Sequence, residues 1–175
     1  VHIKARIPDG KNEYWIHEVA IIDDAIGMDP VLLRRALKFA DGSRSHDKKS
    51  QRGLGKFGMG LPNSSMSRCR RLEVYSWQKG EVFHTYLDID EMDKEKYDVI
   101  PKPIKTELPA KWIKRCKFKI QKSGTLVIWK NCDRIGWARP KTLIKNCEPR
   151  IGRMYRYFID DGKAKIRLAV FQDKN

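Results

Sequence analysis

The sequence predicts an α+β domain, a two-layer sandwich in which a mixed, mostly antiparallel sheet carries helices on one face. Short runs of alternating or β-branched residues recur along the chain and are typical of strands. Several of these runs are joined by tight turns, which favours antiparallel neighbours. Segments with helical periodicity separate them. At 175 residues, of which 41% are hydrophobic, residues 1–175 fit one domain with an ordinary core.

The first elements are expected to be two strands and a capped helix. Residues 1–7, VHIKARI, alternate, and residues 14–23, YWIHEVAIID, become increasingly apolar, as in a strand that enters the core. Asp29 and Pro30 then supply a helix N-cap and a first-turn proline. We expect this helix to end at Gly42, ahead of a polar loop.

The later elements follow from the same rules. Residues 71–90 predict a hairpin around Lys79 and Gly80, because two alternating runs flank that turn. A helix is expected over residues 61–69, with Pro62 tolerated in its first turn. Two more strands are predicted at 124–131 and 165–172, and a helix at 140–159.

Charge and cysteine usage limit the classes of partner. The net charge of +15 favours polyanionic partners, namely nucleic acid, nucleotide phosphates or an anionic membrane surface, although it also fits a merely solvated basic surface. No apolar run reaches the roughly 20 residues of a membrane helix, so we expect no membrane span. The four cysteines, at 69, 116, 132 and 147, lack metal-site spacing, and we expect reduced thiols in a cytoplasmic or nuclear protein.

A cluster of glycines at 53, 55, 58 and 60 lies within SQRGLGKFGMGLPNSSMSRC, residues 50–69. A Walker P-loop is excluded, because Phe57 stands where a hydroxyl would hold Mg²⁺. A dinucleotide fingerprint is disfavoured, because polar residues precede the cluster instead of a buried strand. Two interpretations stay open: a hinge or packing turn, or a glycine lid whose backbone N–H groups approach phosphates, helped by the charge of Lys56.

A second motif, IIDDAIGMDP, begins at the end of the strand predicted over residues 14–23. The carboxylate of Asp23 can accept a hydrogen bond from an exocyclic amine such as adenine N6, and a base without that donor would leave it unpaired. Gly27 lets a base lie against the backbone, and Met28 offers soft apolar contact. An ordinary strand–turn–helix junction is the alternative.

Three segments, Asp23–Met28, GKFGMGL at Gly55–Leu61 and SGTLVIW at Ser123–Trp129, together resemble the GHKL ATPases, the superfamily of gyrase, heat-shock chaperones, histidine kinases and MutL with the Bergerat fold. The form FGMGL is most similar to MORC-type and chaperone-like members. The order and number of the motifs extend the resemblance over most of the chain.

The resemblance implies a role for each matching residue. Asp23 would bind the adenine amine, Gly27 would line the base, Met28 would pack on the ring, and Thr125 would help to hold the adenine through water. Lys56 would lie closest to the terminal phosphates and stabilise them. The phosphates would be wrapped by Gly55, Lys56, Phe57, Gly58, Met59 and Gly60. The basic loop from 42 to 52 would be the ATP lid.

Two departures from the family pattern bear on catalysis. Ala25 replaces the usual glycine after the aspartates. The family's glutamate general base and Mg²⁺-binding asparagine lie on a helix before the first strand, and this chain starts at the strand. We therefore expect ATP and Mg²⁺ to be cofactors of a slow ATPase whose base and metal ligand lie outside the chain. Glu13 and Glu18, on or beside the second strand, are not assigned as catalytic.

The resemblance also implies a nucleotide-driven switch that forms an ATP-dependent homodimer, in a DNA-associated process. A basic stretch, with alternating lysines expected on a strand face, suits contact with the phosphates of DNA or RNA. Its basic residues include Lys111, Lys114, Arg115, Lys117 and Lys119. A solvated sheet edge is the other interpretation. The alternative function is a polyanion-binding module with a degenerate nucleotide pocket.

Overall fold

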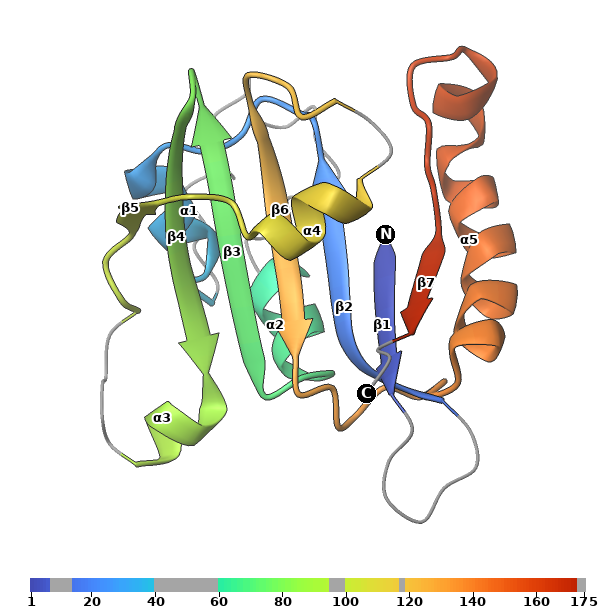
Figure 1. Ribbon diagram of the computed structural model, residues 1–175, viewed down its shortest axis with the longest axis horizontal. Coiled ribbons are helices and arrows are strands. Elements are labelled where there is room, and N and C mark those ends of the chain that lie inside the picture. Colours follow the sequence, from blue (N-terminus) through green and yellow to red (C-terminus); the bar gives the residue numbers. More distant parts are fainter. Residues whose placement is uncertain (7–13, 40–59, 95–99, 117–118, 173–175) are drawn as a thin grey trace.

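The computed structural model describes residues 1–6, 14–39, 60–94, 100–116 and 119–172, and confirms the α+β sandwich (Figure 1). One seven-stranded sheet has the order β5-β4-β3-β6-β2-β1-β7. All neighbouring pairs are antiparallel except β1 and β7, which are parallel. The strands are β1 (His2–Arg6), β2 (Trp15–Asp23), β3 (Arg71–Gln78), β4 (Glu81–Asp88), β5 (Ile104–Thr106), β6 (Gly124–Lys130) and β7 (Ala169–Gln172). The helices are α1 (Pro30–Ala36), α2 (Gly60–Met66), α3 (Ile89–Asp93), α4 (Ala110–Arg115) and α5 (Pro140–Asp160).

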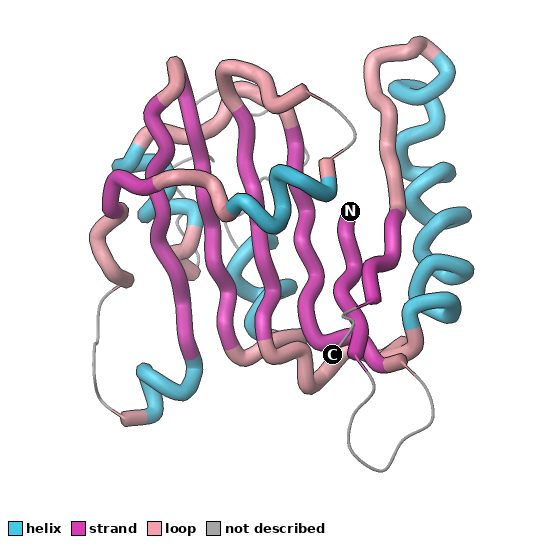
Figure 2. The backbone as a smooth tube through the Cα atoms, viewed as in Figure 1, coloured by secondary structure: helices cyan, strands magenta, loops and turns pink. Residues whose placement is uncertain are grey.

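Side-chain alternation along β6 divides the core between the two faces of the sheet. Val127 and Trp129 point to the face that α1, α2 and α5 cover, which we call the α1/α2 face. Leu126 and Ile128 point to the opposite face, where they pack with Trp112 of α4. The expectation of helices on one face therefore holds for α1, α2 and α5, whereas α4 crosses the other face, in front of the sheet in Figures 1 and 2.

The hairpin predicted over residues 71–90 is confirmed for residues 71–88, whereas residues 89 and 90 belong to α3. Strands β3 and β4 pair in continuous register from Arg71↔Asp88 to Gln78↔Glu81. Lys79 and Gly80 have φ values of 51° and 87°, the two consecutive positive values of a type I′ turn. That turn matches the twist of its strands, so the local sequence determines the register.

Elsewhere the structure corrects the predicted boundaries. Helix α1 is capped by the side chain of Asp29 as expected, but it ends at Ala36 rather than at Gly42. The prediction of a strand that carries alternating lysines is wrong for residues 110–115. These residues form α4, whose Trp112 is fully buried against the sheet. Helix α3 was not predicted, and it starts where Asp88 accepts hydrogen bonds from the next turn.

Candidate nucleotide-binding site

Three polar residues form a row across the α1/α2 face, at the end of the sheet where β2 ends. Asp23 of β2 is the register partner of Thr125 on β6, and Thr125 is the partner of Ser76 on β3. Paired residues point to the same face, so the three side chains are neighbours. Their exposure increases along the row, from fully buried Ser76 through half-buried Thr125 to exposed Asp23. The row therefore leads from the core to the protein surface at Asp23.

The carboxyl group of Asp23 is anchored from its own turn. Its Oδ1 accepts a hydrogen bond from the backbone N–H of Ala25 at 3.1 Å. Desolvation near the strand end raises the pKa of Asp23, while hydrogen bonds from the backbone N–H groups of Ala25 and Thr125 oppose that shift. An anchored carboxylate at the surface is an acceptor suited to an incoming N–H donor.

Residues 24–28 form a turn that lies tightly against the end of β3. Gly27 has a φ of 68°, and a side-chain carbon there would overlap the carbonyl oxygen of Trp77 and lie 3.1 Å from that of Gly124. The side-chain amide of Gln78 donates to the carbonyl of Ile26 at 3.0 Å. Glycine is therefore required at position 27 for both its backbone conformation and its close approach to β3.

Met28 connects this turn to the core. Its backbone N–H donates to the hydroxyl of Ser76 at 2.7 Å. Its side chain packs against a cluster that includes Leu33, Leu72 and Val74. The contact with a nucleotide ring stays a prediction for Met28, as does the lining of the base for Gly27.

Ser76 is the residue that sequence reasoning missed. Its hydroxyl contacts Met28 N, donates to the carbonyl of Gly124 at 3.0 Å and lies 3.4 Å from Oγ1 of Thr125. One signal was available in the sequence. In the alternating strand at 71–78, Ser76 lies on the same face as the apolar residues Leu72 and Val74. A hydroxyl group on an apolar, buried face needs hydrogen-bond partners.

Most of the predicted phosphate-binding segment lies outside the described residues. This holds for Gly55, Lys56, Phe57, Gly58 and Met59, as it does for the loop at 42–52. Gly60 is the first residue of α2 and is exposed, and a side chain there would meet open space. Helix α2 packs on the α1/α2 face, where Oγ of Ser65 accepts a hydrogen bond from the indole N–H of Trp129 at 2.8 Å. Of this segment, only Gly60 is placed by the structure, at the start of a helix on the face that carries the Asp23 row.

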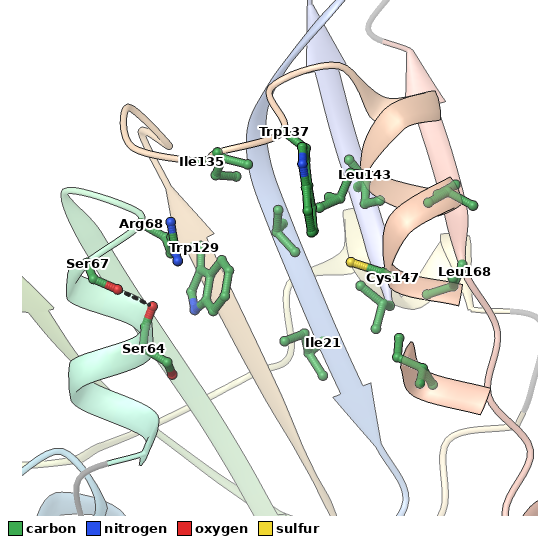
Figure 3. A pocket seen from close by; sticks show the side chains of 16 residues that line it. Ile21, Ser64, Ser67, Arg68, Trp129, Ile135, Trp137, Leu143, Cys147 and Leu168 are labelled. Atoms are coloured by element: carbon green, nitrogen blue, oxygen red, sulfur yellow. Dashed lines mark hydrogen bonds between the residues drawn. The ribbon is translucent and has the colours of Figure 1, made fainter. Parts of the chain in front are cut away.

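An apolar groove of about 460 Å³ lies on this same face, between α2 and α5 (Figure 3). Its floor includes Ile21, two residues before Asp23, and Trp129. Ile21 is 37% exposed, which is unusual for an isoleucine at an inward-facing position of a central strand. Arg68, Ser64 and Ser67 form the polar part of its lining, at the α2 side. The face beside the Asp23 row is therefore incompletely covered by the described residues.

The predicted basic residues do not join the Asp23 row. Lys111 and Lys114 lie on α4, which crosses the opposite face, and Lys111 is paired with Glu18 at 3.0 Å. The guanidinium group of Arg115 lies over the rings of Trp112 and Phe171. Lys114 and Lys119 are exposed, and Lys117 lies outside the described residues.

Other kinds of site receive no support from the described residues. All four cysteines are free. Among the described residues, no group of three or more histidine, cysteine or acidic side chains is placed to hold a metal ion. Within the same parts of the chain, no helix has the length and apolar character needed to cross a bilayer.

The family model for histidine kinase-, DNA gyrase B- and HSP90-like ATPases matches residues 1–125, and the chain belongs to this family. It is an ATP-binding domain of the GHKL type. Curated proteins provide no match to the chain. The matched range includes β1 to β5 and ends at Thr125, so it contains the whole of the Asp23–Thr125–Ser76 row.

Proposed function

We propose that this chain binds ATP with the adenine at the Asp23–Thr125 row, as the nucleotide-binding part of a slow, Mg²⁺-dependent ATPase that couples nucleotide binding to a change of shape. The row itself is the observation that carries the proposal. It presents a carboxylate and a hydroxyl, side by side, where the sheet reaches the protein surface. A buried or anchored acceptor discriminates strongly, because a base without a matching donor leaves it unpaired.

The turn at residues 24–28 supports the same placement of the base. It is held on β3 by Gly27, by the amide of Gln78 and by the N–H of Met28, so its backbone forms a rigid wall next to Asp23. A rigid wall limits the entropy that would otherwise be lost when a ligand is ordered against it. The phosphates would then extend towards α2 on the same face, whose first residue is Gly60.

Hydrolysis needs a general base and a ligand for Mg²⁺. No acidic or histidine cluster among the described residues fits Mg²⁺, and Glu18 is engaged with Lys111 on the opposite face of the sheet. We propose that the base and the metal ligand come from a helix outside the described residues. The apolar groove between α2 and α5 supports this, because its lining suits the apolar stripe of a helix.

Calorimetric titration with a non-hydrolysable ATP analogue and Mg²⁺ tests the placement of the base. We expect the Asp23→Asn variant to lose binding, because the amide replaces an acceptor oxygen with a donor. The matched control is Asp24→Asn, which removes the same charge from the next residue of the turn and should leave most of the affinity. Equal losses in the two variants would show that charge, and not the position of Asp23, governs binding.

Polyanion binding is the second candidate function, favoured by the net charge of +15 and by the exposed Lys114 and Lys119. As an alternative to the ATPase, the chain would be a polyanion-binding module with a degenerate nucleotide pocket; in the first proposal, the ATP-dependent switch and homodimer act in a DNA-associated process. Affinity for duplex DNA should fall steeply between about 50 and 200 mM salt, as phosphate contacts require. An affinity for DNA that does not change with salt in this range would exclude the basic surface as the DNA-binding site. Asp23→Asn should leave DNA binding unchanged.

A further inference from the structure

The hydroxyl group of Ser76 connects its own strand, β3, to two segments that are far away in the sequence. It contacts the backbone N–H of Met28 at 2.7 Å, the carbonyl of Gly124 at 3.0 Å and Oγ1 of Thr125 at 3.4 Å. Ser76 is completely buried, so water does not compete for these contacts. The three partners belong to the turn after β2 and to the beginning of β6, which are the two elements that border the nucleotide row.

The number of hydrogen atoms in this cluster determines the direction of each bond. A serine hydroxyl has one hydrogen and two lone pairs. The hydrogen of Ser76 goes to the carbonyl of Gly124, which can only accept. One lone pair receives the N–H of Met28, which can only donate. The remaining lone pair faces Oγ1 of Thr125, so the hydroxyl of Thr125 must be the donor in that contact.

A threonine hydroxyl whose hydrogen is used in this way has only lone pairs left for a ligand. Asp23, the register partner of Thr125, also presents acceptor oxygens when it is ionised. We propose that Ser76 is a positioning residue that determines base specificity. Because Ser76 accepts the hydrogen bond from the Thr125 hydroxyl, Thr125 and Asp23 can offer a ligand only acceptor atoms. The site should then select purine bases with an exocyclic amino group over bases with a carbonyl at the same ring position. This rests on the proposed placement of the nucleotide.

The test compares the affinities for ATP and ITP, whose bases differ in the amino or carbonyl group at the same ring position. The wild-type chain should prefer ATP. In Ser76→Ala the hydrogen of Thr125 is free to turn towards a carbonyl, and the ATP-to-ITP affinity ratio should fall about tenfold, the worth of one hydrogen bond. Ser76→Thr keeps the hydroxyl and should restore the ratio.

A double-mutant cycle separates this role from a structural one. Thr125→Val removes the hydroxyl that Ser76 orients, so adding Ser76→Ala to it should change the ratio no further. The matched control is Thr85→Val, which removes a fully buried hydroxyl that donates to the carbonyl of Pro101 at 2.8 Å, on β4 and outside the row. It should lower the thermal stability and leave the ratio unchanged.

The outcomes are distinguishable. A folded Ser76→Ala variant that keeps the wild-type ratio overturns the role of Ser76, and so does an equal further drop on the Thr125→Val background. Should Ser76→Ala fail to fold, Ser76→Cys replaces it, because a thiol is a much weaker hydrogen-bonding group. The ATP-to-ITP affinity ratio of Ser76→Cys should then fall, and an unchanged ratio would overturn the role of Ser76. A wild-type chain that binds neither nucleotide would instead refute the proposed function, and this inference with it.

Discussion

Replacement of Gly27 by alanine should both destabilise the fold and weaken ATP binding. Gly27 has a φ of 68°, and its missing side chain leaves room for the carbonyl oxygens of Trp77 and Gly124. An alanine in the left-handed region costs about 1–2 kcal/mol. Forcing the added methyl group into packed backbone costs about 1–3 kcal/mol more. We therefore expect the free energy of unfolding to fall by about 2–5 kcal/mol.

Gly162 supplies the matched control, because its φ of 67° is nearly the same, whereas a side chain there would meet nothing within 4 Å. Gly162→Ala should show only the backbone term, about 1–2 kcal/mol. The gain from a stiffer unfolded chain applies equally to both variants and cancels in the comparison.

Urea unfolding of the two variants measures the difference in stability, and titration with an ATP analogue measures the effect on the site. Because the turn at residues 24–28 must move away from β3 to admit the methyl group, Gly27→Ala should bind at least tenfold more weakly, and Gly162→Ala should bind normally. If the two variants lose the same stability and bind equally well, the close approach of the turn to β3 is not what requires glycine at position 27.

Three further predictions concern charge and packing. Folding raises the pKa of Asp23 above its ordinary 3.8, chiefly by desolvation. ATP affinity should therefore rise with pH through that raised pKa, while the free energy of unfolding that this group contributes should decrease over the same range. Calorimetry and thermal melts from about pH 3.5 to 7, mostly above the ordinary value, would show both trends, and a flat binding profile would contradict the first. Burial alone would raise the pKa of Glu73, but Lys130 and Arg71 outweigh burial and lower this pKa below 4.5. The ionised Glu73 should therefore stabilise the fold fully above pH 4.5, and this stabilisation should be lost as the pH falls through the lowered pKa. Glu73→Gln should cost about 2 kcal/mol in urea unfolding at pH 7, because its side chain is only 6% exposed and the change weakens a charged hydrogen bond with the partly exposed Lys130. Glu81→Gln, in an exposed pair with Lys105, should change little. Trp112→Ala should cost about 3–5 kcal/mol by the same measurement, since the ring is fully buried against the sheet, and a loss below 1 kcal/mol would mean that α4 is not packed there.

Local patterns predicted the elements whose conformation depends on near neighbours. The hairpin at residues 71–90 depends on two alternating runs and a Lys-Gly turn, and its register follows from that turn. The cap of α1 depends on Asp29, whose side chain accepts a hydrogen bond from Leu32 three residues later. Such contacts span a few residues, so composition and spacing reveal them.

Segments whose conformation is decided by distant partners were predicted less well. Alternating lysines at 117 and 119 led to the prediction of a strand in this part of the chain. Residues 110–115 instead form α4, in which Trp112 packs with Leu126 and Ile128 of the sheet. Likewise β7 lies parallel to β1, a pairing between residues more than 160 positions apart. No local pattern contains that information, because burial against a partner overrides intrinsic preference.

The sequence by itself predicted which residues would bind the nucleotide: an acceptor at Asp23, a glycine and a methionine after it, and a threonine at 125. The family match covers all of these positions, and their contacts with a nucleotide stay predictions. The tertiary structure alone decided that Asp23, Thr125 and Ser76 stand in one row, and that the turn at 24–28 is held against β3. The physical reason is that a residue's type limits which hydrogen bonds it can make, whereas the register between distant strands decides which of them it does make.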